Sequence, residues 1–200
     1  AYVAKKYNIP LIITEHSSFK TAIYIKDSYK DFIINSYKEA DKLIAVSHSL
    51  KNELKELTDR DDIGVISNLI NLENFNVEIK KEASKDFTFL TLAYLEGDKG
   101  MDTLIKAFSK HSLESDNSKL IIGGEGSQRN YLETLVKDLN IKDKVTFKGA
   151  LSRKEVAIEM NNCDAFVLAS NYETFGVVYV EALACGKPII GTKNGGAEYI

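Results

Sequence analysis

The chain has 200 residues, of which 44% are apolar and 28% charged, and it carries a formal net charge of −3 with a pI near 5.7. This mixture is typical of a folded globular protein with a sizeable core, which argues against extended disorder. The weak negative charge gives no general attraction to nucleic acid, so we expect no nucleic-acid partner.

Two further signals concern the cellular compartment. No apolar run approaches the roughly 18 to 20 residues that a membrane-spanning helix needs, and the start of the chain lacks a signal-type segment. Cys163 and Cys185 stand too far apart for a CxxC motif, so we interpret both as small buried residues. We therefore predict a cytoplasmic location, with peripheral contact at the inner face of the cell membrane as the alternative.

Short β-branched runs alternate with longer amphipathic stretches along the whole chain, which is typical of βαβ units and predicts an α/β fold with parallel sheets. In the first part, 1–8 reads as the end of a helix, and Ser49 is expected to cap a later helix. The strands expected there are 11–14, 43–46 and 64–67, and the helices are 27–40 and 50–58.

A polar stretch without a sustained apolar period, 71–86, separates this part from a second block. The strands expected in the second block are 87–95, 120–123, 145–148, 165–169 and 188–191, alternating with helices at 102–110, 128–139, 154–161 and 176–185. Five such strands favour a doubly wound sheet of order 3-2-1-4-5, which binds ligands where the winding reverses. The loops 96–100 and 170–174 should line that point.

We expect two Rossmann-like domains. Residues 1–75 would form the carboxyl-terminal part of an amino-terminal domain, 76–86 a linker, and 87–200 a second domain truncated at its end. Both ends of the chain fall inside expected helices, and this pattern predicts a fragment.

Glu173 and Glu181 are the most informative candidates for a binding site. A carboxylate accepts two hydrogen bonds side by side, which suits neighbouring sugar hydroxyls, and the free amides of a helix start attract anionic oxygens. On an amphipathic helix a glutamate is usually solvated. The neighbours of Glu181, however, are Val177, Val178, Val180, Ala182, Leu183 and Ala184. Such a helix has no polar face, so the charge needs a partner.

These residues belong to a wider pattern, which resembles the retaining glycosyltransferases of family 4 and their two-domain GT-B architecture. The resemblance covers nearly the whole chain, and the segment from Glu173 to Glu181 is its most specific part. The other matching segments are AVSHSLKNEL (45–54), VISNLINLENF (65–75), LAYLEGDKGMDTLIKAF (92–108), IGGEG (122–126), VTFKG (145–149), CDAFVLAS (163–170) and PIIGTKNGGAEYI (188–200).

The resemblance implies roles for individual residues. Glu173 would contact the donor sugar and Glu181 the ribose hydroxyls, while Lys99 would neutralise the departing diphosphate. The backbone amides of Thr174, Phe175 and Gly176 would meet the sugar and diphosphate, and Tyr94 and Gly124 are expected at the same site. In the family a histidine near the position of His16 reaches the donor sugar. The alternative for His16 is an ordinary strand-end histidine that hydrogen-bonds locally.

One departure from the family pattern concerns the diphosphate. Members usually have Gly-Arg just after the first strand of the second domain, whereas this chain has Ala93-Tyr94. Tyrosine can donate one hydrogen bond but cannot supply the charged, planar fork of arginine. The sequence leaves two interpretations open: weaker stabilisation of the leaving group, or compensation by another basic residue such as Lys193.

Two other motifs are discounted. The segment Gly124-Glu125-Gly126 has Arg129 where a dinucleotide fingerprint needs its third glycine, and it follows the wrong strand. Asp59-Arg60-Asp61 resembles the Asp-x-Asp of metal-dependent sugar transferases, but it precedes a strand, so we interpret it as a solvated charge run. We expect no metal and no cofactor.

The sequence thus predicts an enzyme that transfers a sugar, with retention of configuration, from a UDP- or GDP-linked donor to the hydroxyl of a sugar, lipid-linked or polysaccharide acceptor. Frequent use of Lys, Ile and Asn suggests a bacterial setting such as cell-surface polysaccharide or glycoconjugate synthesis. Two alternatives remain: a nucleotide-sugar-binding fragment without turnover, and a sugar-nucleotide epimerase of the same architecture.

Overall fold

The structure is a computed structural model that describes residues 1–19, 26–77 and 85–200. Most of the predicted linker, 78–84, lies outside the described residues. The chain divides into two compact units: unit 1 comprises 1–69, 172–176 and 194–200, and unit 2 comprises 70–171 and 177–193. The predicted domain limits remain a prediction.

Unit 1 contains a parallel sheet whose described strands have the order β1-β2-β3. Its elements are α1 (Tyr2–Tyr7), β1 (Ile12–Glu15), α2 (Asp27–Glu39), β2 (Lys42–Ala45), α3 (His48–Thr58), β3 (Gly64–Val65) and the 3-10 helix η3 (Gly195–Tyr199). Leu43, Leu50 and Leu54 are fully buried in its core, between the sheet and the inward faces of the helices.

The start of α3 corrects one sequence prediction. Ser47, not Ser49, caps this helix, because the Ser47 hydroxyl oxygen accepts a hydrogen bond from the backbone N–H of Leu50 at 3.1 Å. Ser49 lies inside the first turn, where its hydroxyl is 3.3 Å from that of Tyr172. The prediction was wrong because two serines stand two positions apart, and only the backbone geometry decides which one precedes the first turn.

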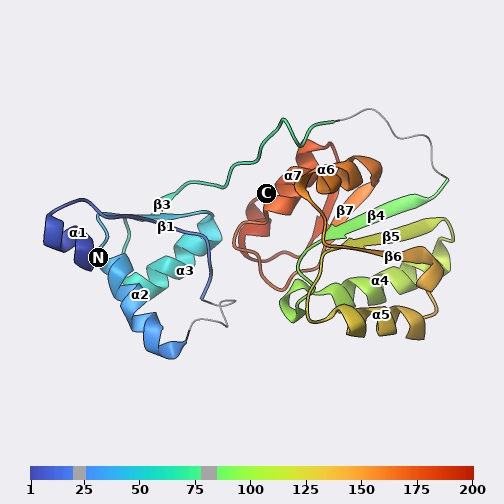
Figure 1. The fold of residues 1–200 in the computed structure, drawn as a ribbon, viewed down its shortest axis with the longest axis horizontal. Coiled ribbons are helices and arrows are strands. Elements are labelled where there is room, and N and C mark those ends of the chain that lie inside the picture. Colours follow the sequence, from blue (N-terminus) through green and yellow to red (C-terminus); the bar gives the residue numbers. More distant parts are fainter. Residues whose placement is uncertain (20–25, 78–84) are drawn as a thin grey trace. The chain divides into compact units, whose positions relative to one another are not determined.

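Unit 2 is a doubly wound α/β unit, coloured green to red in Figure 1. Its sheet has the order β6-β5-β4-β7-β8, which confirms the predicted 3-2-1-4-5 arrangement. The helices α4 and α5 cover one face of this sheet, and α6 and α7 cover the other (Figure 1). Its strands are β4 (Phe87–Leu92), β5 (Ser118–Gly123), β6 (Val145–Gly149), β7 (Ala165–Leu168) and β8 (Ile189–Gly191); its helices are η1 (Gly97–Lys99), α4 (Met101–Glu114), α5 (Arg129–Asp138), η2 (Lys142–Lys144), α6 (Arg153–Asn162) and α7 (Val177–Ala184).

Local sequence explains why these elements form and end where they do. The four residues of β7, Ala165 to Leu168, are all buried, as expected for a central parallel strand. Ser152 and Glu155 form a capping box at the start of α6, which satisfies the first free amides of that helix. Cys163 and Cys185 are each 1% exposed and unbridged, which confirms the interpretation of both as buried thiols.

Among the described residues, no helix has both the length and the apolar character that crossing a bilayer demands.

Candidate functional site

The carboxyl ends of β4 and β7 form the switch point of the unit 2 sheet. These strands are neighbours, and the chain leaves them in opposite directions along the sheet order. The backbone N–H of Asn171, after β7, donates to the carbonyl oxygen of Asp98, after β4, at 2.8 Å. The two loops that the sequence predicted to line a ligand site are therefore joined directly by their backbones.

Gly100 makes the second connection between these loops. It has φ +61°, and a Cβ atom at this position would lie 2.0 Å from the carbonyl oxygen of Ala169. Only glycine combines that backbone conformation with so close an approach. The turn 97–100 is thus packed against the end of β7.

Lys99 lies in η1, in the turn that these contacts hold. Its Nζ is 3.7 Å from Oδ2 of Asp98, and its side chain is 22% exposed. Its backbone N–H donates to the carbonyl oxygen of Glu96 at 3.1 Å, while the Glu96 carboxylate accepts two hydrogen bonds from Ser127. The structure therefore places Lys99 on a braced turn at the switch point, and its contact with a diphosphate stays a prediction.

Tyr94 and Gly124, also predicted at the donor site, follow β4 and β5. The Tyr94 side chain is 79% exposed. The N–H of Gly124 donates to the carbonyl oxygen of Gly149 at 2.7 Å, and a Cβ on Gly124 would lie 1.9 Å from the carbonyl oxygen of Ala93. A close approach of backbones thus accounts for glycine at 124, and its contact with a donor remains untested.

Glu181 is buried in α7, with 1% of its side chain exposed. Its Oε1 accepts a hydrogen bond from Nη1 of Arg153 at 2.5 Å, whereas its Oε2 is buried and has no hydrogen-bond partner among the described residues. Burial raises the pKa of Glu181, and Arg153 acts in the opposite direction. A half-satisfied buried carboxylate is costly to a fold, so Oε2 of Glu181 needs a hydrogen-bond donor.

Arg153 is a residue that the sequence interpretation missed. The apolar surroundings of Glu181 predicted that a partner exists, but the partner lies 28 positions earlier at the start of α6. The guanidinium of Arg153 also lies over the ring of Phe75, 4.8 Å from its centroid. The available signal was the capping box of Ser152 and Glu155, because it fixes Arg153 as the first residue of α6.

The loop that carries Glu173 is assigned to unit 1 together with 194–200. The N–H of Gly196 donates to the carbonyl oxygen of Glu173 at 2.5 Å, and a Cβ on Gly196 would lie 2.3 Å from the carbonyl oxygen of Thr174. The Ser47 hydroxyl also donates to the Thr174 carbonyl at 2.5 Å. These contacts fix the backbone of the predicted donor loop.

Phe175 and Gly176 complete that loop. Phe175 is partly buried against the apolar core of unit 1. Gly176 is buried and has φ 88°, so it turns the chain where a side chain would be strained. The hydrogen bonds expected from the amides of Thr174, Phe175 and Gly176 to a donor stay predictions, as does the role of Glu173.

His16 lies in unit 1 directly after β1, with an exposed side chain. Its backbone N–H and that of Ser17 both donate to Oε1 of Glu15, at 2.9 and 2.7 Å. The buried Glu53 carboxylate accepts hydrogen bonds from Ser18 and from the backbone of Phe19, at 2.7 to 2.9 Å. Two carboxylates thus hold the loop that presents His16, whose reach toward a donor sugar remains a prediction.

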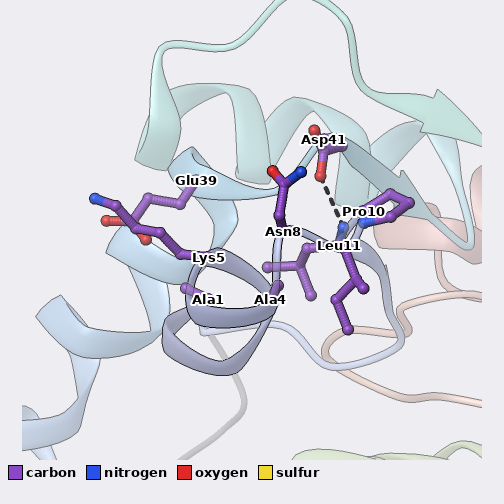
Figure 2. A pocket seen from close by; sticks show the side chains of 9 residues that line it. Ala1, Ala4, Lys5, Asn8, Pro10, Leu11, Glu39 and Asp41 are labelled. Atoms are coloured by element: carbon purple, nitrogen blue, oxygen red, sulfur yellow. Dashed lines mark hydrogen bonds between the residues drawn. The ribbon is translucent and has the colours of Figure 1, made fainter.

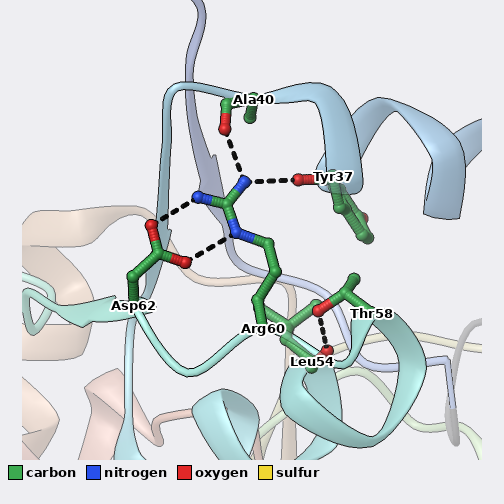
Figure 3. A network of polar contacts seen from close by, with 6 residues as sticks. All are labelled: Tyr37, Ala40, Leu54, Thr58, Arg60 and Asp62. Atoms are coloured by element: carbon green, nitrogen blue, oxygen red, sulfur yellow. Dashed lines mark hydrogen bonds and ion pairs between the residues drawn. The ribbon is translucent and has the colours of Figure 1, made fainter.

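Asp59 and Asp61 are exposed, as predicted for a solvated charge run, but Arg60 between them is not, which corrects the sequence interpretation for that residue. Figure 3 shows that the Arg60 guanidinium donates to both carboxylate oxygens of Asp62, at 2.7 and 2.8 Å, and to the carbonyl oxygens of Tyr37 and Ala40, at 2.9 and 2.5 Å. The side chain of Arg60 is 14% exposed. The arginine therefore closes the carboxyl end of α2, whose last carbonyls have no partner inside the helix.

No cluster of metal-ligand side chains occurs among the described residues.

We expect Arg60→Ala to lower the free energy of unfolding by roughly 1 to 3 kcal/mol, because buried carbonyl oxygens lose their donor. Urea denaturation of the intact protein measures this effect. Lys55→Ala is the matched control, since the ion pair of Lys55 with Asp61 is exposed (56% and 83%) and its loss should change little. Equal destabilisation by both variants would contradict the assigned role.

The described residues also line an open pocket of about 580 Å³ in unit 1, shown in Figure 2. Its wall includes Asp41, whose Oδ2 accepts a hydrogen bond from the backbone of Leu11 at 2.7 Å. The lining residues are Ala1, Ala4, Lys5, Asn8, Ile9, Pro10, Leu11, Glu39 and Asp41. This set mixes charges of both signs and contains none of the predicted donor-site residues, so we do not assign nucleotide binding to it.

Comparison with known families gives two adjacent matches. The model of glycosyl transferases group 1 matches residues 73–200, and that of glycosyltransferase family 4 matches residues 1–74.

Relatives of the chain carry related names. N-acetyl-alpha-D-glucosaminyl L-malate synthase of Bacillus anthracis is 32% identical over 98% of the chain and 54% of its own length. An uncharacterized glycosyltransferase of Methanocaldococcus jannaschii is 34% identical over 79% of the chain and 44% of its own length. Alpha-monoglucosyldiacylglycerol synthase of Streptococcus pneumoniae is 28% identical over 96% of the chain and 48% of its length. The chain spans about half the length of these relatives.

Solved structures share the fold. Sucrose-phosphate synthase from Thermosynechococcus elongatus superposes with a TM-score of 0.87 at 22% identity, covering 99% of this chain and 54% of that one. Anabaena HepE in complex with UDP-glucose superposes with a TM-score of 0.83 at 22% identity, covering 99% and 57%. The predicted GT-B type of α/β fold is thereby confirmed.

Proposed function

The chain belongs to the glycosyl transferases group 1 and glycosyltransferase family 4, and on this ground we propose that the protein transfers a sugar from a nucleotide-sugar donor to an acceptor hydroxyl. The observation that carries this proposal is the buried Glu181, whose Oε2 lacks a partner among the described residues. A ribose hydroxyl would supply the missing hydrogen bond. Complexes of HepE with UDP and with UDP-glucose support a nucleotide-sugar donor in this fold.

We assign the residues the roles that the resemblance to the family implies. Glu181 binds the ribose, Glu173 orients the donor sugar, and the amides of Thr174, Phe175 and Gly176 approach the sugar and diphosphate. Lys99 takes up the negative charge that develops on the oxygen of the departing nucleoside diphosphate. His16 contacts the donor sugar.

We further propose that transfer retains the anomeric configuration. The bond from the anomeric carbon to the diphosphate oxygen breaks while the acceptor oxygen bonds to the same face, and the acceptor proton passes to the departing diphosphate oxygen. The diphosphate charge is met by Lys99, Tyr94 and backbone amides, with no metal in this scheme. Analysis of the product anomer by NMR tests this step, and an inverted product would refute it.

The acceptor and cellular setting belong to the same proposal. A UDP- or GDP-linked donor and a sugar, lipid-linked or polysaccharide acceptor suit glycoconjugate synthesis at a bacterial surface, on the cytoplasmic side of the membrane. The relative from Streptococcus pneumoniae is named a monoglucosyldiacylglycerol synthase, which supports a lipid acceptor as one candidate.

A ligand panel tests the function most directly. The melting temperature of the intact protein is measured with UDP-, GDP- and ADP-sugars, because a ligand at 100 times its Kd stabilises the native state by about 2.7 kcal/mol. We expect one nucleotide class to raise the melting temperature of the wild type, and Glu181→Gln to weaken that response. The absence of any response would overturn the proposal.

Turnover of the ligand that binds then separates the alternatives. Nucleoside diphosphate released only when an acceptor is present supports a transferase. Altered sugar nucleotide formed without acceptor identifies an epimerase, and binding without any product identifies a binding module. Both of these last outcomes contradict sugar transfer.

A further inference from the structure

The guanidinium of Arg153 lies outside the segment from Glu173 to Glu181 but contacts Glu181. Its guanidinium is held on two sides: Nη1 donates to Oε1 of Glu181 at 2.5 Å, and the plane lies over the Phe75 ring, 4.8 Å from the centroid. Phe75 itself is fully buried, so it forms a fixed base beneath the charge. The contact of a guanidinium with an aromatic face is attractive and restricts where the group can lie.

The two partners of this ion pair differ sharply in exposure. The Glu181 side chain is 1% exposed and that of Arg153 is 61% exposed. Arg153 is therefore a surface residue whose guanidinium contacts a buried carboxylate. Oε2 of that carboxylate has no hydrogen-bond partner among the described residues. An arginine has several N–H donors, and here one of them orients the carboxylate by occupying a single oxygen.

The other charged groups near α7 do not compete for Glu181. The elements packed against α7 include α6, β7 and β8, and the Tyr179 hydroxyl of α7 donates to the carbonyl oxygen of Leu168 in β7. On α6, Glu155 is engaged by Ser152 in the capping box, and Glu159 pairs with Lys148 at 2.9 Å. Neither β7 (Ala165–Leu168) nor β8 (Ile189–Gly191) carries a charged side chain. Lys154 of α6 is exposed, and Arg153 is the charged group of these elements that acts on Glu181.

We propose that Arg153 is a positioning residue: it turns the Glu181 carboxylate so that Oε2 accepts a hydrogen bond from a ribose hydroxyl of the donor. This inference rests on the proposed function. It assigns the recognition of a ribonucleotide to a pair of residues from α6 and α7, with Phe75 as support, instead of to Glu181 alone.

The sign of the expected pH dependence follows from the two opposing causes. Burial raises the pKa of Glu181, and Arg153 lowers it. Removal of the arginine therefore raises the pKa further, so that the carboxyl group becomes protonated at a higher pH. A protonated carboxyl group is a poorer acceptor for the ribose, so binding weakens as the pH falls and recovers as the pH rises.

The test measures the Kd of UDP-glucose for the intact protein between pH 5.5 and 8.5, with GDP-glucose in a parallel series. Both phosphates of these diesters stay ionised over the whole range, so the profile reports on the protein. In Arg153→Met we expect the pH midpoint of binding to lie above that of the wild type, with affinity falling by up to about tenfold for each pH unit below it. Arg153→Lys, which keeps the charge, should restore most of the wild-type profile.

Lys154→Met is the matched control, because it removes an exposed positive charge from the next position of α6. It should leave the pH profile unchanged. Suppose that Glu181→Gln loses affinity for the sugar nucleotide while Arg153→Met keeps the wild-type pH profile. This result would overturn the inference and leave the proposed function intact. If the wild type responds to no sugar nucleotide of the ligand panel, the proposed function fails and the inference fails with it. Titration of the Glu181 carboxyl carbon by NMR in wild type and Arg153→Met adds a measurement that needs no ligand, and an unchanged pKa there would also overturn it.

Discussion

Replacing Lys99 with methionine in the intact protein is expected to lower kcat by a factor on the order of 10² to 10³, with a much smaller change in the KM for the donor. Methionine keeps the length of the side chain but removes the charge that would stabilise the departing diphosphate. That charge matters more in the transition state than in the bound donor, so the loss appears mainly in kcat. Steady-state kinetics with the donor identified by the ligand panel measures the effect.

The position of Lys99 explains why the expected loss is large. Its turn is braced by the hydrogen bond from Asn171 to the carbonyl oxygen of Asp98, and its side chain is only 22% exposed. A charge fixed in advance at the leaving group needs no rearrangement during the reaction. The Tyr94 side chain, 79% exposed where the family usually has arginine, carries no charge that could replace it.

Two further variants separate Lys99 from other lysines. Lys110→Met removes an exposed charge from α4 and should leave kcat unaltered. Lys193→Met tests the alternative raised by the sequence, in which another basic residue compensates for the missing arginine. If Lys193→Met lowers kcat while Lys99→Met does not, the assignment of the leaving-group charge to Lys99 is wrong.

Much of the fold could be predicted because its determinants are local. Runs such as 165–168 are continuously apolar and short, the helices between them have periodic faces, and right-handed crossovers then allow few strand orders. The observed order β6-β5-β4-β7-β8 follows from these constraints. The boundaries were less accurate: α4 continues to Glu114, four residues beyond the predicted end, because its buried face extends to Ser112.

The site, like the fold, contains features that the local sequence predicts and features that it does not. Glu181 could be singled out because a charge in an apolar helix violates the local pattern, and the structure shows it buried as that violation implied. Its partner Arg153 could not be identified from the sequence, and neither could the hydrogen bonds of Arg60 at the end of α2. Both depend on segments that approach each other only after folding. In each case the signal is a long-range hydrogen bond, from Arg153 to Glu181 or from Arg60 to the carbonyl oxygens of Tyr37 and Ala40.

Gly100→Ala is expected to reduce both stability and activity, with kcat/KM falling by about 10²-fold. The added Cβ would lie 2.0 Å from the carbonyl oxygen of Ala169, so the turn 97–100 must move away from the end of β7. Alanine also has to adopt φ near +61°, which costs about 1 to 2 kcal/mol for a residue with a side chain. Because a displacement of about 1 Å at a catalytic group can cost a factor of 10², moving Lys99 is expected to dominate the kinetic effect.

Gly97→Ala is the matched control for this variant. Gly97 lies in the same turn, yet a Cβ at that position would meet nothing within 4 Å. Kinetics and thermal unfolding of the two variants, compared with wild type, therefore distinguish displacement of the turn from a general effect of adding a methyl group near Lys99. If Gly100→Ala retained wild-type kcat/KM, the contact between the two loops would have no part in placing Lys99. If Gly100→Ala lost activity while Gly97→Ala did not, the contact between the loops after β4 and β7 would set the position of the Lys99 charge.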